Sequence, residues 1–255
     1  MLPAGYERLL LTHAVAVARS DLAAAIRRSL VNADGSNSTL HEYAARQPSA
    51  RALRGRGVAY AVNLPLSGLR VVVRHNTHGG LFAPLTRDRF TPPTRAPYEL
   101  ETSIALTRLG VPTPEVVAYV LYPPGGLLQR ADVCSREVPG SRDLADILAT
   151  ASDRVAAIAA TADLVASLSR VGARHHDLNA KNILLTDEKA YVLDVDRLTL
   201  GEKPEAALDA NLARLSRSLR KWREQFGARI SDDEISELHA LAQRAFDRLA
   251  SGSLS

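Results

Sequence analysis

Residues 175–194 contain side chains whose types could take part in phosphoryl transfer. Asp177 follows His175 by two positions and precedes Asn182 by five, and Asp194 comes seventeen positions after Asp177. A carboxylate such as Asp177 can accept the proton of a hydroxyl group that attacks a γ-phosphoryl group. Asn182 and Asp194 offer hard oxygen ligands for the Mg²⁺ that neutralises the phosphates. These residue types make Asp177 a candidate catalytic carboxylate and Asn182 and Asp194 candidate metal ligands.

Short strands and long helices must position these residues. Residues 182–185 and 191–194 read as two strands around a turn at 186–189, and helices are predicted at 143–149, at 153–171 and from about 207 onward. The alternative interpretation of the same segment is a polar turn that caps two hairpin strands, with the histidines as incidental loop residues. His175 is expected to bridge this loop to the backbone near Asp194, and packing alone is the alternative.

The first half of the chain is predicted to bind the nucleotide. Strands are expected at 58–63, 69–74, 116–121 and 127–134, and a helix at 99–109 that ends at a glycine. Gly55 and Gly57 precede the first of these strands and could let backbone N–H groups approach phosphates, although a plain loop is equally consistent. Arg74 ends its strand at a place that resembles the one where protein kinases carry a lysine, and a cation there would hold the α and β phosphates, with Glu99 or Glu101 as its ion-pair partner. Glu137 and its neighbouring backbone are expected near adenine from position alone.

A basic helix is predicted at 211–226. Its apolar residues recur at intervals of three and four, while Arg214, Arg217 and Arg220 lie on other faces. These arginines are candidates for contact with an anionic lipid or with acidic groups of a substrate. A solvated helix face is the alternative.

Composition sets broad limits. The chain has 255 residues, 46% of them hydrophobic and 24% charged, with a net charge of +4. These values are typical of a globular protein. The single cysteine, Cys134, excludes an internal disulfide and a cysteine-rich metal site. We expect no membrane span, secretory signal or nucleic-acid partner, but the charge permits anionic partners.

The motif at 175–194 resembles the catalytic loop and metal-binding aspartate of protein-kinase-like phosphotransferases, and this resemblance assigns the catalytic role to Asp177 and the metal-ligand roles to Asn182 and Asp194. The string 177–185, DLNAKNILL, is similar to that of the 3-deoxy-D-manno-octulosonic acid (Kdo) kinases within the lipopolysaccharide kinase family. Protein kinases usually have a lysine where this chain has Asn179. Four further blocks agree with the Kdo kinases: 73–75 followed by Gly79-Gly80, 109–114, 194–197 and 211–221. The resemblance covers about residues 55–223.

The resemblance implies an α+β, bilobal protein-kinase-like fold with a strand-rich N-lobe at 51–135 and a helical C-lobe at 136–255. Residues 1–50 are predicted to form an N-terminal helical extension, with a helix at 7–30. ATP and Mg²⁺ are the implied cofactors. The implied acceptor is an anionic sugar or lipid-linked sugar, reached from the cytoplasm with peripheral contact to the inner face of the bacterial inner membrane. Further candidates for substrate contact are Asn179, Lys181, Asp196 and Arg197.

Two other functions compete with a lipopolysaccharide sugar kinase. A kinase-fold enzyme acting on another small molecule or on protein would share Asp177, Asn182 and Asp194 without needing the basic helix. A nucleotide-binding pseudokinase would fit the arginine at position 74, where kinases carry a lysine, but the intact trio argues against it. The short interval between Asp194 and Ala210 lacks an activation-loop signature, which disfavours a regulated protein kinase.

Overall fold

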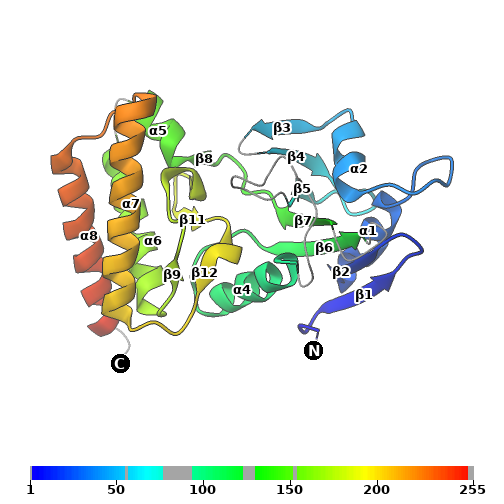
Figure 1. The fold of residues 1–255 in the computed structure, drawn as a ribbon, viewed down its shortest axis with the longest axis horizontal. Coiled ribbons are helices and arrows are strands. Elements are labelled where there is room, and N and C mark those ends of the chain that lie inside the picture. Colours follow the sequence, from blue (N-terminus) through cyan, green and yellow to red (C-terminus); the bar gives the residue numbers. More distant parts are fainter. Residues whose placement is uncertain (1, 55–56, 77–93, 123–129, 152–153, 252–255) are drawn as a thin grey trace. The chain divides into compact units, whose positions relative to one another are not determined.

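The computed structural model describes residues 2–54, 57–76, 94–122, 130–151 and 154–251. The chain divides into two compact units, whose helices and strands are labelled in Figure 1. The sheet unit comprises Met1–Ile104 and Glu115–Glu137, and the helical unit comprises Ala105–Pro114 and Val138–Ser255. Among the described residues, no helix has both the length and the apolar composition needed to cross a bilayer.

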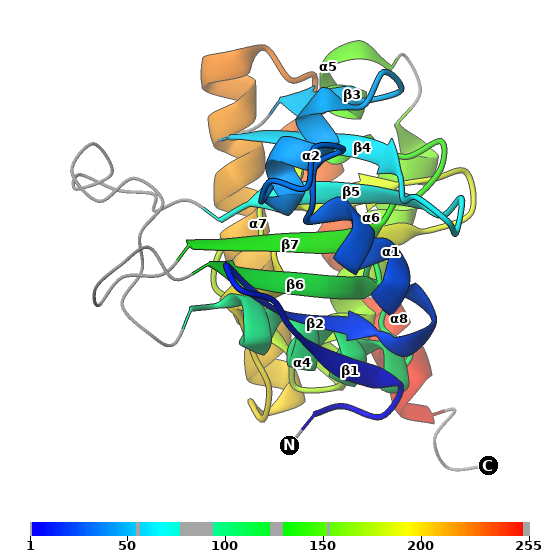
Figure 2. The ribbon, with the colours of Figure 1, turned by 90° about the vertical axis from the view of Figure 1, so that its right-hand side faces the viewer.

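The sheet unit is built on a seven-stranded antiparallel sheet with the strand order β1-β2-β6-β7-β5-β4-β3. Figure 2 shows these strands stacked from β3 to β1, with helices α1 and α2 in front of them. The strands are β1 (Tyr6–Leu10), β2 (Val15–Arg19), β3 (Arg51–Arg54), β4 (Val58–Asn63), β5 (Arg70–His75), β6 (Val116–Tyr122) and β7 (Arg130–Arg136). The helical segments are η1 (Ser20–Leu22), α1 (Ala23–Ser29), α2 (Leu40–Arg46) and α4 (Ala96–Arg108).

Both faces of this sheet pack against helices. Successive side chains along a strand point to opposite faces, so one strand contributes to two cores. Ala16 and Ala18 of β2 belong to the core that includes Ile26 of α1. Val17, between them, belongs to a second core with Leu100 of α4. The sheet therefore holds α4 against one face and α1 with α2 against the other.

The predicted helix at 7–30 is wrong over its first half, and residues 1–50 are not a helical extension. Residues 6–10 and 15–19 form β1 and β2, and only 20–29 are helical. β2 pairs with β6, which buries Ala16 and Ala18 completely. Alanine favours helices in isolation, but the tertiary pairing of a strand with small buried side chains overrides that preference.

Three long helices form the core of the helical unit, and Figure 1 shows α6, α7 and α8 side by side. Leu164, Val165 and Leu168 of α6 share one core with Leu215 of α7 and Leu238 of α8. The elements are β8 (Arg142–Asp143), α5 (Leu144–Thr150), α6 (Val155–Arg170), β9 (Arg174–His175), η2 (Ala180–Asn182), β10 (Ile183–Leu185), β11 (Ala190–Val192), η3 (Val195–Arg197), β12 (Leu198–Thr199), α7 (Pro204–Phe226) and α8 (Asp232–Ser251).

Helix α7 has a proline at its start and a glycine just past its end. Pro204 occupies the first turn, where a missing N–H costs nothing. Gly227 follows the last helical residue, and its φ of 69° is left-handed, as is common for the residue that ends a helix. The buried residues of α7 lie on one side of the helix, which fixes how α7 is rotated against α6.

The predicted α+β class, with a strand-rich part followed by a helix-rich part, is confirmed. The units divide between Glu137 and Val138, whereas the sequence placed the boundary between residues 135 and 136. Residues 105–114 also count with the helical unit, which the sequence did not predict. Of the expected strand at 127–134, the part before Arg130 lies outside the described residues.

Candidate active site

The loop that carries Asp177 is anchored by a buried histidine. His175 is 1% exposed, and its Nδ1 accepts a hydrogen bond from the Asp177 backbone N–H at 3.1 Å. This leaves the proton on Nε2, which donates to the Leu193 carbonyl at 2.9 Å. Burial lowers the pKa of His175, so the ring is held neutral. The predicted bridge from His175 to the backbone beside Asp194 is present.

Side-chain amides shape the rest of the loop. The Asp177 carbonyl accepts hydrogen bonds from Nδ2 of Asn179 at 2.9 Å and from Nδ2 of Asn182 at 3.0 Å. Asn179 Oδ1 in turn accepts from the Lys181 backbone N–H at 2.9 Å. The side-chain amide of Asn179 therefore donates one hydrogen bond to the loop backbone and accepts another from it.

The two predicted metal ligands lie at the same end of the β10–β11 hairpin. The Leu193 backbone N–H donates to the Asn182 carbonyl at 2.9 Å, which places Asn182 opposite the residue that precedes Asp194. Within the described chain, neither the Asn182 side-chain oxygen nor the Asp194 carboxylate takes part in a hydrogen bond or ion pair. Two hard oxygen donors without a partner among the described residues fit a magnesium site.

Asp194 has a backbone conformation that is uncommon for residues other than glycine. Its φ of 53° and ψ of 45° are left-handed, and it is one of two such non-glycine residues in the described chain. A non-glycine residue held this way costs free energy, and such residues cluster at functional sites. The sequence predicted a strand through residue 194, but β11 ends at Val192 and the chain turns at Asp194. The described residues contain no group of three or more His, Cys, Asp or Glu side chains able to share a metal ion.

The remaining loop candidates are held by local ion pairs. Lys181 Nζ lies 3.0 Å from Asp143 Oδ2 and 5.4 Å from the centre of the Trp222 ring. Arg197 Nε lies 3.6 Å from Asp196 Oδ2. Lys181 is thus directed toward Asp143.

The candidate arginines of α7 differ in their surroundings. Arg214 forms an ion pair with the Asp177 carboxylate. Arg220 lies 3.5 Å from Asp232, at the start of α8. Arg217 is exposed and has no partner among the described residues. The basic face is therefore not uniform: one arginine contacts the loop, one contacts α8 and one faces solvent.

The sheet unit holds the predicted phosphate-contacting cation. Arg74 of β5 forms an ion pair with Glu99 of α4, and its Nη1 donates to Asn76 Oδ1 at 3.2 Å. Glu99 is 5% exposed, whereas Glu101 is exposed. Of the two partners that the sequence left open, the structure pairs Arg74 with Glu99.

The other residues predicted to contact the nucleotide are Glu137, Gly57 and Gly55. The Glu137 carboxylate forms ion pairs with Arg51 and Arg70. Gly57 is followed directly by β4, and a Cβ added there would meet no described protein atom within 4 Å. Gly55 lies outside the described residues, as do Gly79 and Gly80.

Sequence analysis missed two residues that position the loop from α7. Asn211 is fully buried, and its Oδ1 accepts from the His175 backbone N–H at 2.9 Å. Ser218 Oγ accepts from the Ala180 backbone N–H at 3.2 Å. The sequence did offer a signal for Asn211, which stands beside Leu212 of the apolar seam of α7. A polar residue at the edge of such a seam can be buried, and a buried amide must find hydrogen-bond partners.

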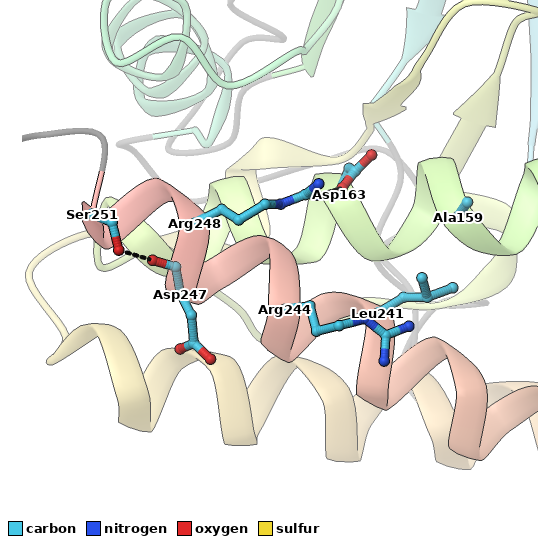
Figure 3. Close-up of a pocket in the computed structure, with 7 residues that line it drawn as sticks. All are labelled: Ala159, Asp163, Leu241, Arg244, Asp247, Arg248 and Ser251. Atoms are coloured by element: carbon cyan, nitrogen blue, oxygen red, sulfur yellow. Dashed lines mark hydrogen bonds and ion pairs between the residues drawn. The ribbon is translucent and has the colours of Figure 1, made fainter.

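A surface hollow of about 670 Å³ between α6 and α8 holds none of the predicted site residues. Figure 3 shows its lining, in which Arg248 approaches Asp163 from the neighbouring helix. The Ser251 hydroxyl donates to the Asp247 carbonyl at 3.1 Å in the same region. None of the residues that line this hollow belongs to the loop that carries Asp177.

Comparison with known proteins identifies the class of enzyme. The family model described as "Lipopolysaccharide kinase (Kdo/WaaP) family" matches residues 43–241. The chain is a phosphotransferase that acts on a sugar hydroxyl. It belongs to the lipopolysaccharide kinase (Kdo/WaaP) family.

Curated relatives agree with this assignment. A 3-deoxy-D-manno-octulosonic acid kinase of Stenotrophomonas maltophilia is 34% identical over 198 residues, covering 76% of this chain and 76% of the relative. A protein of the same name from Actinobacillus succinogenes is 32% identical, covering 72% of this chain and 80% of the relative. Among solved structures, WaaP in complex with acyl carrier protein is similar at 19% identity and a TM-score of 0.43, covering 79% of this chain and 89% of that one.

Proposed function

We propose that this chain transfers the γ-phosphoryl group of ATP to a hydroxyl of Kdo or of a related lipopolysaccharide core sugar. The observation that carries the proposal is the loop in which Asp177 is held beside Asn182 and next to the turn at Asp194. The names of the relatives at 31–34% identity support Kdo as the acceptor sugar.

In this proposal Asp177 orients the acceptor hydroxyl and receives its proton. His175 and Asn182 hold the backbone of Asp177, so the carboxylate is positioned before the substrate arrives. Asn182 and Asp194 would hold Mg²⁺, which supplies charge neutralisation on the phosphates when it is bound. Arg74, oriented by Glu99, would contact the α and β phosphates.

The acceptor side of the proposal concerns charge. Kdo is a sugar acid, and its lipid-linked precursor also carries phosphate, so cations on α7 could bind it. Arg217 is exposed without a described partner. We place the enzyme in the cytoplasm with peripheral contact to anionic lipid at the inner membrane, where exposed cations would contribute about 1 kcal/mol each.

The test is transfer of labelled γ-phosphate from Mg²⁺-ATP to a Kdo-bearing lipid A precursor. Asp177→Asn should abolish transfer while leaving nucleotide binding in place. Asp187→Asn, the same chemical change in the exposed hairpin turn, should retain wild-type transfer. Wild-type turnover in the Asp177 variant would overturn the assignment of the proton acceptor.

A second measurement separates acceptors. Nucleotide binding without transfer to the Kdo lipid would favour a different acceptor, such as another small molecule or a protein. Failure to bind Mg²⁺-ATP at all would favour a pseudokinase. The variant Arg217→Glu should weaken transfer to the lipid-linked acceptor without changing ATP affinity, and unchanged transfer would make that face of α7 merely solvated.

A further inference from the structure

The catalytic loop, residues 177–182, lacks a free cation beside Asp177. Asn179, two positions after Asp177, is neutral and uses both ends of its amide within the loop. Lys181 is the loop's own cation, but Asp143 holds its ammonium group at 3.0 Å. Charge that develops on a transferring phosphoryl group would therefore find no cation from these residues at the catalytic carboxylate.

Helix α7 brings a cation to that position. Arg214 contacts Oδ1 of Asp177 through Nη2. The side chain of Arg214 is 39% exposed and that of Asp177 is 20% exposed, so neither side chain is fully buried. Among the described residues, Asp177 is the only hydrogen-bond or ion-pair partner of the Arg214 guanidinium, which has five N–H donors.

The placement of Arg214 is built into the fold. Asn211 binds the His175 backbone one turn earlier, and Ser218 binds the Ala180 backbone one turn later. These positions are spaced by three and four residues, so they lie on one face of α7. The same face that anchors the loop at both ends presents Arg214 to Asp177.

We propose that Arg214 of α7 places its positive charge against the γ-phosphoryl group. The residues of the catalytic loop supply no cation for this role. This inference rests on the proposed function. A planar guanidinium can contact the carboxylate through one N–H and a phosphoryl oxygen through another. In the free enzyme the same contact orients the Asp177 carboxylate.

The transfer step needs no reactant other than ATP and the acceptor hydroxyl. The acceptor hydroxyl oxygen attacks the γ-phosphorus and forms the new O–P bond. The bond from the γ-phosphorus to the oxygen shared with the β-phosphate breaks, and ADP leaves with that electron pair. The hydroxyl proton passes to Asp177, while Arg214 stays protonated and stabilises the charge on the phosphoryl oxygens.

The experiment compares Arg214→Gln and Arg214→Lys with Arg248→Gln, which breaks an exposed Arg–Asp contact of 3.4 Å with Asp163. Two quantities are measured: kcat for phosphoryl transfer, and the ratio of the Kd of ADP to that of β,γ-imido-ATP. Arg214→Gln should lower kcat about 100- to 1,000-fold and lower the Kd ratio about 10-fold. Arg214→Lys should recover part of both losses, and Arg248→Gln should change neither by more than about twofold.

Three outcomes would overturn the inference. Unchanged kcat and Kd ratio in Arg214→Gln would leave the residue without a role. A rise in KM for the sugar acceptor alone would assign Arg214 to acceptor binding. A loss of kcat that Arg214→Lys does not relieve, with an unchanged Kd ratio, would make the contact merely structural. If the wild type binds both nucleotides but transfers nothing to a Kdo acceptor, the proposed function fails while the Kd ratio still tests Arg214.

Discussion

The side chain of Asn211 ties helix α7 to the backbone of His175, which anchors the loop that carries Asp177. Its Oδ1 accepts from the His175 N–H at 2.9 Å, and its Nδ2 donates to the Ala173 carbonyl at 2.9 Å and to Ser169 Oγ at 3.2 Å. Asn211 is fully buried, so water cannot replace these bonds. One amide therefore links the end of α6, the strand β9 and the helix α7.

Replacing Asn211 with alanine should destabilise the helical unit. The variant would leave the His175 N–H and the Ala173 carbonyl buried without partners, at about 1–3 kcal/mol for each group. The free energy of unfolding, measured in urea, should fall by about 2–6 kcal/mol. Asp209→Asn, an exposed change on the same helix, should stay within about 0.5 kcal/mol of the wild type. Equal stability of the two variants would contradict the role of Asn211.

Gly172→Ala should be more damaging than Gly227→Ala, although both glycines have left-handed backbones with φ of 66° and 69°. A Cβ at Gly172 would lie 2.4 Å from the Glu202 carbonyl oxygen, whereas nothing lies within 4 Å of one at Gly227. Gly227→Ala should cost about 1 kcal/mol from backbone strain alone. Gly172→Ala should cost more than this, because the backbone at Glu202 must also move. Thermal unfolding of both variants would decide the order.

The loop at 175–194 could be predicted because its residues are close in sequence. Asn182 and Asp194 flank one hairpin and Asp177 lies just before it; the strands of that hairpin have alternating burial, so the local pattern was sufficient to predict them. The pairing of Arg74 with Glu99 was open because two glutamates two positions apart differ only in which face of α4 they occupy.

The contacts from α7 could not be predicted in the same way. Arg214 reaches Asp177 across 37 positions, and this depends on the rotation of α7 that Leu215 and Leu219 fix by burial. β1 and β2 were missed for a related reason: β2 is a strand because it pairs with distant β6, and β1 because it pairs with β2, whatever their composition favours.

Stability should fall as the pH is lowered below about 6.5, the ordinary pKa of histidine. Burial lowers the pKa of His175 in the folded chain, so above that pH both states are neutral and His175 contributes no difference. Below it, the unfolded chain binds the proton first, which lowers the free energy of unfolding by up to about 1.4 kcal/mol per pH unit. Urea midpoints between pH 8 and 5.5 would measure this slope. His175→Gln should flatten it, and the exposed His176→Gln should not; equal slopes in all three proteins would rule out His175 as the cause.

Cys134 should resist thiol reagents in the folded protein. It is fully buried in the sheet unit, and burial raises the pKa of its thiol, so little thiolate forms and reagents have no access. As the single cysteine of the chain, it should react with a disulfide reagent only after unfolding in urea. The urea dependence of that reaction would report the opening of the sheet unit. Rapid labelling at neutral pH without urea would contradict the burial of β7.

Glu99→Gln should weaken nucleotide binding, because Glu99 orients the Arg74 that we propose contacts the α and β phosphates. A charge-assisted pair contributes more than a neutral hydrogen bond, so the Kd of Mg²⁺-ATP should rise about 10-fold. Glu101→Gln is the matched control, since Glu101 is exposed two positions further along α4. In the double variant with Arg74→Gln, the loss should be smaller than the sum of the single losses, because both changes remove one interaction. Additive losses, or an equal effect of Glu101→Gln, would mean that the pair does not act as a unit in holding the nucleotide.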